Sequence, residues 1–259
     1  MIPIKDDIPT RRFPLVTVLI IVACAVVYFG VEQGGIGLGS KGNEEVVEYG
    51  AIPYEVSHPG KQCDEQQGQI ICEGQKGVSG SAGEQAPTWL TLFTSMFLHG
   101  GILHLAGNML FLWIFGNNIE DSMGRGRFAL FYVLGGLAAL FGQTLINPDA
   151  TAPTVGASGA IAAVLGAYAL LYPRARVITL IFIIIFFTIV ELPALVVLGL
   201  WFLIQVFYGA SELGQPVGGS GGVAYFAHIG GFLFGLLLIK LFANNVHEDY
   251  ESQRRIPVY

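Results

Sequence analysis

Ser158 lies between two glycines in the run Gly-Ala-Ser-Gly-Ala at residues 156–160, and this setting makes it the first candidate for chemistry. An apolar segment follows, so Ser158 is expected at a helix N-terminus, where unpaired backbone N–H groups can stabilise an oxyanion. A serine in such a place acts as a nucleophile when a base removes its proton. The same small residues also form a packing motif between membrane helices, and the run alone leaves both interpretations open.

His228, at the start of the last apolar segment, is the candidate base. Ionisable side chains within membrane segments are costly and usually functional, although a lone histidine can also be a structural hydrogen-bonding group. Residues three or four positions apart share a helix face, and small residues let two helices pack closely. If two such faces meet, the histidine can take the proton of the serine. The faces consist of Ser158, Ala162 and Gly166 in one helix and of His228, Gly231 and Gly235 in the other.

His104 and Asn108 form a further polar pair, four positions apart and therefore on one helix face, near the start of the second apolar segment. In hydrolases, a donor aimed at a developing oxyanion is worth about 2.7 to 4 kcal/mol. Together with the backbone N–H of Ser158, these side chains would form an oxyanion site. The alternative is that they only tie helices together through hydrogen bonds.

The composition and the apolar segments indicate what kind of fold must position these residues. Of the 259 residues, 53% are hydrophobic and 12% are charged, and the mean hydropathy is +0.60, values that indicate a protein of the lipid bilayer. A formal net charge of -6 gives no support to nucleic-acid binding. Apolar segments occur at residues 13–31, 102–119, 128–146, 155–172, 177–208 and 223–239.

The segment 177–208 is too long for one crossing, because its helix would extend about 48 Å. Glu191 and Pro193 also interrupt it. A single crossing from about Ala194 to Tyr208, with an interfacial approach before it, fits better than two. The expected fold class is therefore all-α: a polytopic membrane protein with a bundle of six transmembrane helices.

The basic residues predict the orientation of this bundle, since short cytoplasmic loops collect Lys and Arg. Ten of the thirteen fall on one side of the six segments, which places both termini in the cytoplasm. The expected organisation is a tail at 1–12, a domain at 13–243 with an exposed extracytoplasmic loop at 32–88, and a tail at 244–259. Cys63 and Cys72 lie in that loop and could pair only in an oxidising compartment. The ten are Lys5, Arg11, Arg12, Arg125, Arg127, Arg174, Arg176, Lys240, Arg254 and Arg255.

Taken together, these motifs resemble the rhomboid family of intramembrane serine proteases over nearly the whole chain. The resemblance implies a Ser158–His228 dyad without a carboxylate and an oxyanion site made by His104, Asn108 and the Ser158 backbone. It further implies a first loop lying partly in the membrane surface and a cap over the site, for which the glycine-rich residues 214–222 are suited. The matching motifs lie at residues 89–97, 99–101, 104–108, 156–160 and 227–235.

Two positions depart from the family pattern. Leu90 follows Trp89 where many relatives have arginine, which puts the usual polar anchoring of the first loop in doubt. Ala162 stands where relatives often place an aromatic ring against the catalytic histidine, so the orientation of His228 is open. Tyr225 is a hypothetical substitute.

The functional expectation is an intramembrane serine endopeptidase that cleaves transmembrane helices of membrane-protein substrates near their outer ends. No cofactor is expected, and no residues have the spacing of metal ligands. The alternatives are a non-catalytic rhomboid-like protein that binds membrane partners, and a transporter or channel, which would need polar residues along a complete pathway. A bacterial plasma membrane is the expected location, because the segment before the first span is too short for a typical transit peptide.

Overall fold

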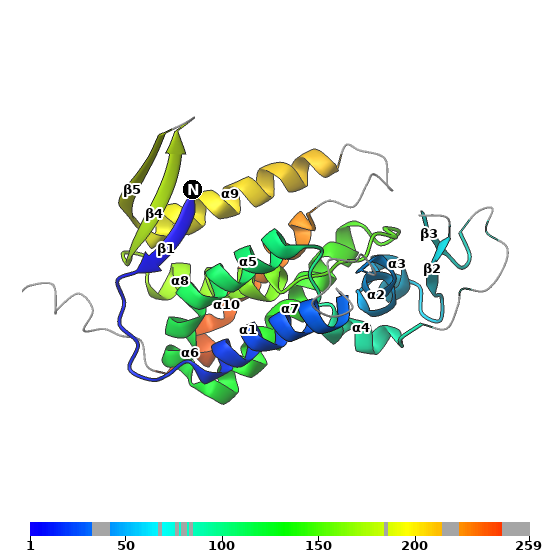
Figure 1. Ribbon diagram of the computed structural model, residues 1–259, viewed down its shortest axis with the longest axis horizontal. Helices are drawn as coiled ribbons and strands as arrows, with labels where there is room; N and C mark the ends of the chain where they lie inside the picture. Colours follow the sequence, from blue (N-terminus) through cyan, green and yellow to red (C-terminus); the bar gives the residue numbers. More distant parts are fainter. Residues whose placement is uncertain are drawn as a thin grey trace, which may run out of the picture.

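The structure, a computed structural model, describes residues 1–32, 42–66, 69–75, 78, 82, 85–183, 186–213 and 223–244. Helices predominate among them, and five are long and apolar enough to cross a membrane, so the chain is an integral membrane protein. The first is α1 (Leu15–Val27) with the π-helical turn η1 (Tyr28–Glu32), and the second joins α5 (Ile102–Phe111), η2 (Leu112–Gly116) and α6 (Asn117–Met123). The others are α7 (Arg125–Ile146), α9 (Ala194–Glu212) and α10 (Tyr225–Phe242) (Figure 1).

The sixth apolar helix, α8 (Ser158–Leu171), is shorter than expected. Its 14 residues extend about 21 Å, less than the thickness of the hydrocarbon core. All residues from Gly159 to Ala169 are buried, and α8 packs mainly against α10 and α7. A helix enclosed by its neighbours need not match the lipid thickness, because protein rather than lipid surrounds it.

The backbones of α8 and α10 approach so closely that side chains are excluded between them. A Cβ built on Gly231 would lie 2.1 Å from the carbonyl oxygen of Gly159, and one on Gly235 would lie 1.8 Å from that of Ala163. On the facing side, a Cβ on Gly166 would lie 2.1 Å from the carbonyl oxygen of Phe232. Such distances are open only to glycine.

The expectation of an all-α fold is corrected by a three-stranded antiparallel sheet in the order β1-β4-β5. Strand β1 (Ile2–Asp6) lies in the expected N-terminal tail, and β4 (Arg176–Ile183) and β5 (Phe186–Pro193) form a hairpin where an interfacial approach was expected (Figure 1). The hairpin is rich in β-branched and aromatic residues, which favour strands. A short apolar run cannot be assigned to helix or strand from periodicity alone.

A buried carboxyl group anchors β1 to the helices. Asp6 is 6% exposed, and its Oδ2 accepts hydrogen bonds of 2.6 Å from Asn118 Nδ2 and 2.6 Å from the Tyr168 hydroxyl. Burial raises the pKa of Asp6 to about 6, although the Tyr168 hydrogen bond opposes the shift. The N-terminal strand is thereby tied to α6 and α8.

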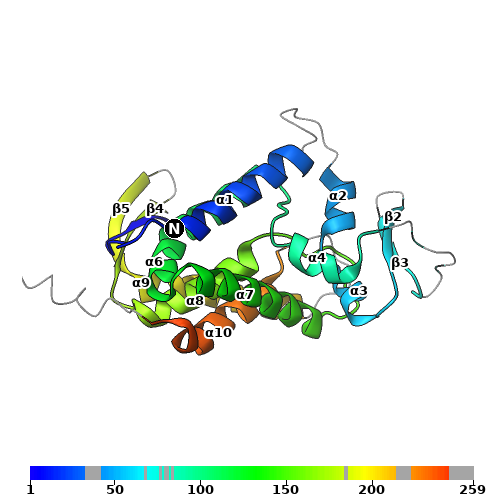
Figure 2. The same ribbon diagram turned by 90° about the horizontal axis from the view of Figure 1, so that it is seen from below.

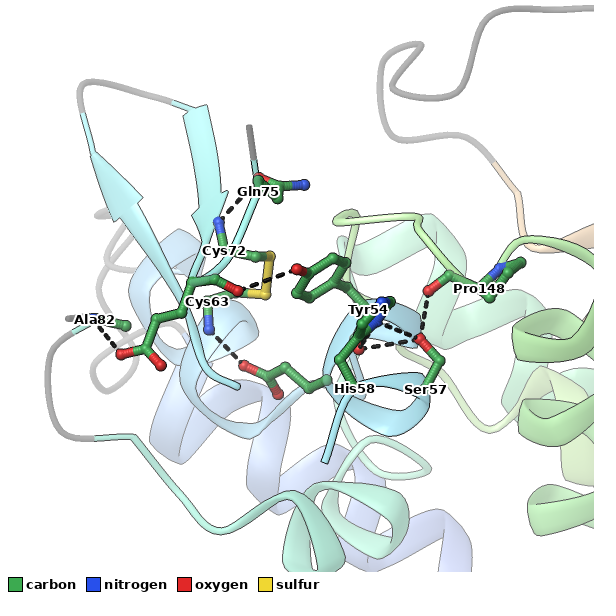
Figure 3. Close-up of a disulfide and its surroundings, with 10 residues drawn as sticks. Tyr54, Ser57, His58, Cys63, Cys72, Gln75, Ala82 and Pro148 are labelled. Atoms are coloured by element: carbon green, nitrogen blue, oxygen red, sulfur yellow. Dashed lines mark hydrogen bonds between the residues drawn. A yellow bond between two sulfur atoms is a disulfide. The ribbon is translucent and has the colours of Figure 1, made fainter. Parts of the chain in front are cut away.

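The segment between the first and second spans is a folded unit rather than only an exposed loop. It contains α2 (Gly42–Tyr49), α3 (Pro53–Ser57), β2 (Cys63–Gln66), β3 (Gln69–Cys72) and α4 (Thr88–Thr94). Cys63 and Cys72 form a disulfide across the β2–β3 hairpin (Figure 3). Sequence composition missed this unit because its own core is small: Val47, Ile52, Tyr54, Cys63 and Cys72.

Side-chain hydrogen bonds complete the unit (Figure 3). Glu55 Oε1 accepts from the backbone N–H of Cys63 at 2.8 Å, and the Tyr54 hydroxyl donates to the Glu73 carbonyl at 3.0 Å. Ser57 Oγ donates to the carbonyl of Pro148 at 2.6 Å, which links the unit to the loop before α8. Figures 1 and 2 place β2 and β3 at one end of the molecule and the β1-β4-β5 sheet at the other.

Candidate active site

Ser158 is the first residue of α8, and the glycine two positions earlier shapes its approach. Gly156 has φ +122°, a conformation that side chains disfavour, and a Cβ there would lie 2.8 Å from the His104 ring. The Gly156 N–H donates to the Ser95 carbonyl at 2.8 Å, which fixes the loop leading into the helix. Glycine is therefore required at position 156 for two reasons: the backbone has a positive φ, and a Cβ would collide with the His104 ring.

His228 lies in the first turn of α10, and the structure brings it to Ser158. Its Nε2 is 2.8 Å from Ser158 Oγ, and the histidine is 9% exposed. Both helices begin at this end of the bundle, so their N-terminal residues meet at one depth. The small-residue faces described above set the separation: Gly231 and Gly235 contact α8, and Ala162 Cβ lies 3.2 Å from the position of a Cβ on Gly231.

The opposite ring nitrogen of His228 has a partner that sequence analysis missed. His228 Nδ1 is 2.8 Å from Oε1 of Gln205, a buried residue of α9. The signal available in the sequence was a lone amide within an otherwise apolar span, where polar side chains are costly. Gln205 thus joins α9 to the Ser158–His228 pair.

The aromatic neighbour of His228 is Trp201, whose ring centroid lies 5.7 Å away at an interplanar angle of 37°. Tyr225, the substitute suggested from the sequence, instead stacks on Tyr208 with centroids 5.5 Å apart. Ala162 is fully buried against α10, so a larger side chain there would meet the neighbouring backbone. The orientation of His228 is accordingly set from α9.

His104 and Asn108, on α5, line the same cavity as Ser158 and His228. This cavity has a volume of about 810 Å³. Asn108 Nδ2 is buried without a hydrogen-bond partner, which is unusual for an amide donor. An unpaired donor beside a nucleophile is suited to an oxyanion that exists only during a reaction.

His99 braces the turn that leads into α5. Its backbone N–H donates to both carboxylate oxygens of Glu32, at 2.9 and 3.0 Å, and its Nδ1 is 3.1 Å from the Phe97 carbonyl. Its ring packs edge-on to His104, with centroids 5.2 Å apart. Burial, and secondarily His104, lowers the pKa of His99 to about 4, so its ring is neutral at neutral pH.

The folded unit between the first and second spans is anchored with leucine, not arginine, at position 90. Trp89 is 65% exposed, and Leu90 belongs to the same short helix α4. Thr94 Oγ1 donates to the carbonyl of Tyr49 at 2.6 Å, and this bond joins α4 to α2. A threonine hydroxyl and backbone groups therefore provide the polar anchoring in this chain.

The other acidic candidates lie apart from the cavity. Asp149 Oδ1 is 3.8 Å from His58 Nε2, and Glu191 forms an ion pair with Arg176 at 3.2 Å. In the part of the chain that the structure describes, no three His, Cys, Asp or Glu residues converge as metal ligands. The proposed cap at residues 214–222 lies outside the described residues.

The sequence was compared with known protein families and with known proteins. The model of the rhomboid domain matches residues 86–245, more than half of the chain. The chain belongs to the rhomboid family. This rhomboid is 30% identical to mitochondrial rhomboid protein 1 of Saccharomyces cerevisiae over 173 residues, which cover 64% of this chain and 45% of that one. It is 32% identical to rhomboid protease GluP of Bacillus subtilis over 154 residues, covering 60% of this chain and 24% of that one.

A plant relative, RHOMBOID-like protein 1 of Arabidopsis thaliana, is 32% identical over 166 residues, which cover 64% of this chain and 38% of the relative. The chain therefore spans less than half the length of each of these three relatives. The region matched by the family model contains α5, α7, α8, α9 and α10, each of which contributes residues to the lining of the cavity.

Proposed function

We propose that this rhomboid is an active serine endopeptidase that cleaves transmembrane segments of membrane-protein substrates. The observation that carries the proposal is the 2.8 Å distance between Ser158 Oγ and His228 Nε2 within the cavity. A serine and a histidine at hydrogen-bond distance form the basic unit of nucleophilic hydrolysis. The relative GluP, which is named a protease, supports the same reaction class.

In the proposed reaction, Ser158 Oγ attacks the carbonyl carbon of a peptide bond while His228 Nε2 takes the hydroxyl proton. The resulting imidazolium returns this proton to the leaving amine, and an acyl-serine remains. Water then attacks the ester, again with His228 as base, and the free carboxylic product and the serine are restored. No other group is needed to balance these steps.

The negative oxygen of the tetrahedral intermediate would be stabilised by three donors. Ser158 is the first residue of α8, where backbone N–H groups have no intrahelical partner. The buried Asn108 Nδ2 has no partner in the resting state, and His104 supplies a ring N–H from one turn earlier on α5. A donor that gains its hydrogen bond only in the transition state lowers the barrier rather than only improving binding.

A six-crossing topology with both termini in the cytoplasm is part of the proposal. Backbone hydrogen bonds between Ala51 and Thr154 join the disulfide-bonded unit to the segment that precedes Ser158, so the disulfide and the cavity share one end. At the other end, Arg127 donates to the carbonyl of Phe242. A disulfide on the outer side and arginine on the inner side agree with this orientation.

The proposed location is a bacterial plasma membrane, with the disulfide facing the oxidising exterior. The Cys63–Cys72 bond supports an oxidising compartment on the side of the cavity. Accessibility of the first folded unit to membrane-impermeant reagents in intact cells tests the orientation, and fractionation of the native cells tests the location.

The deciding experiment uses purified full-length protein in liposomes with a single-span model substrate. Wild-type protein is expected to cleave the substrate and to react covalently with a fluorophosphonate. Ser158→Ala and His228→Ala are each expected to abolish both reactions while melting at the wild-type temperature. Cleavage by Ser158→Ala would contradict the assigned nucleophile, and wild-type protein that neither cleaves nor reacts would indicate a non-catalytic rhomboid.

A further inference from the structure

We propose that Gln205 is a positioning residue that holds His228 in the tautomer able to accept the serine proton, so that the unit is Ser158–His228–Gln205 rather than a dyad. This inference rests on the proposed function, because it concerns the base of the same reaction. Gln205 makes its hydrogen bonds to His228 and Trp201 and does not line the cavity that holds Ser158. It acts only through the imidazole ring.

The contact geometry decides which way the Gln205 amide faces. Its Nε2 donates to the Trp201 carbonyl at 3.1 Å, and its Oε1 lies 2.8 Å from His228 Nδ1. Rotating the amide by half a turn would set its oxygen against the Trp201 carbonyl, placing two acceptors together. The hydrogen-bond partners therefore fix the amide oxygen toward the imidazole.

An amide oxygen can only accept a hydrogen bond, so His228 must carry its proton on Nδ1. In a neutral imidazole the other nitrogen, Nε2, then has the free lone pair that faces Ser158 Oγ. The opposite tautomer would present Nε2–H to the serine and could not remove its proton. Gln205 thus selects the reactive tautomer by the bond it makes on the far side of the ring.

The amide of Gln205 fixes the tautomer of His228 at a lower desolvation cost than a carboxylate would. Gln205 is 7% exposed and lies within the α9 span, where burying an ionised side chain is strongly unfavourable. A neutral amide keeps both of its bonds and adds no charge. Trp201 lies about one turn before Gln205 on α9. Its ring centroid is 5.7 Å from that of the imidazole, and the ring limits rotation of His228.

A purely structural explanation would treat the bond only as a link between α9 and α10. Gln143 provides a matched control, because it is equally buried and its Oε1 accepts from the Ala227 N–H at 3.2 Å. Gln143 therefore supports the same turn of α10 through the backbone, without touching the ring. Loss of either glutamine removes one buried hydrogen bond to α10, but only Gln205 bears on the tautomer.

The test measures the His228 tautomer directly by nitrogen NMR of protein labelled with ¹⁵N-histidine, in detergent, at a pH where the ring is neutral. The chain has five histidines, and the spectrum of His228→Ala identifies the signal. Wild-type protein and Gln143→Leu are expected to show the Nδ1–H tautomer. Gln205→Leu is expected to show a mixture of tautomers, and Gln205→Glu to restore the Nδ1–H form, because a carboxyl group presents an acceptor in either protonation state.

The same variants are compared for the rate of fluorophosphonate reaction at Ser158. Removing a partner that orients a functional histidine costs about 10- to 100-fold in metal sites, and a loss in that range is expected for Gln205→Leu. Gln205→Glu should recover most of the rate. Melting temperatures of the two leucine variants show whether a loss of stability accounts for the change.

Two outcomes would overturn the role of Gln205: an Nε2–H tautomer in wild-type protein, or an Nδ1–H tautomer and a wild-type reaction rate in Gln205→Leu. These results are distinct from failure of the proposed function. If wild-type protein does not react with fluorophosphonate, the protease proposal fails, while the tautomer measurement still decides whether Gln205 orients the ring.

Discussion

Replacing Gly231 with alanine should separate α8 from α10 beside the site. The added Cβ would lie 2.1 Å from the carbonyl oxygen of Gly159, and a Cβ is essentially never closer than 3.0 Å to such an atom. The helices must therefore move apart by about 0.9 Å. Gly231 is less than one turn from His228, so the same movement would lengthen the 2.8 Å contact with Ser158 to about 3.7 Å, too long for a hydrogen bond.

The expected loss of activity follows from this displacement. A misplacement of about 1 Å between reacting groups can cost about 100-fold, and Gly231→Ala should lower both substrate cleavage and fluorophosphonate reaction by that factor or more. Overpacking should also lower the free energy of unfolding by about 1 to 3 kcal/mol. The assays are single-turnover cleavage in liposomes and thermal unfolding followed by circular dichroism.

Gly199→Ala is the matched control, because nothing lies within 4 Å of a Cβ at this position of α9. Alanine is the better helix former by roughly 0.5 to 1 kcal/mol, so this variant should be at least as stable as wild type and equally active. If Gly231→Ala were folded and reacted at the wild-type rate, the contact between α8 and α10 would not set the geometry of the site.

Three further predictions concern separate parts of the structure. Asp6→Asn should remove a pH dependence: the raised pKa of Asp6 favours the folded state below pH 3.8, and this contribution, at most about 3 kcal/mol, is lost as the pH rises through about 6. Melting curves between pH 4 and 7 should therefore fall for wild type relative to the variant, and parallel curves would contradict the buried carboxyl. Cys63→Ser should weaken the first folded unit by about 2 to 4 kcal/mol, measured by limited proteolysis, and should expose Cys72 to membrane-impermeant maleimide in intact cells. A Cys72 that is labelled only after the membrane is permeabilised would contradict the outward orientation. Asn108→Ala should reduce turnover about 100-fold yet leave residual cleavage, because other oxyanion donors remain; wild-type turnover would remove Asn108 from the site.

The chemistry of the site was accessible from local patterns. The candidate nucleophile is a serine between glycines, and the candidate base is a histidine at the start of an apolar segment. Both were inferred from residue type and spacing alone. Polar side chains are easier to recognise as functional in a membrane protein, because burying them in lipid is costly and they are therefore rare. For the same reason the chain could be assigned to the membrane from its composition.

The tertiary structure decided the features that arise from contacts distant in sequence. The hairpin at 176–193 is part of a larger sheet, in which β1, more than 170 residues earlier, pairs with β4 from Ile2 to Asp6. The length of α8 is governed by the helices around it rather than by lipid thickness. Neither property can be obtained from the local hydrophobicity of the segment.

Sequence alone determined that this protein belongs in a bilayer and that Ser158 and His228 were the pair to examine, because residue type and helical spacing act over a few positions. Only the tertiary structure decided that Gln205 faces the remaining nitrogen of His228 and that Trp201 lies beside its ring. A lone amide in an apolar span marks position 205 as unusual but does not reveal its partner, which is 23 residues away along the chain. The orientation of a side chain depends on which helices pack together, and that packing depends on the whole chain at once.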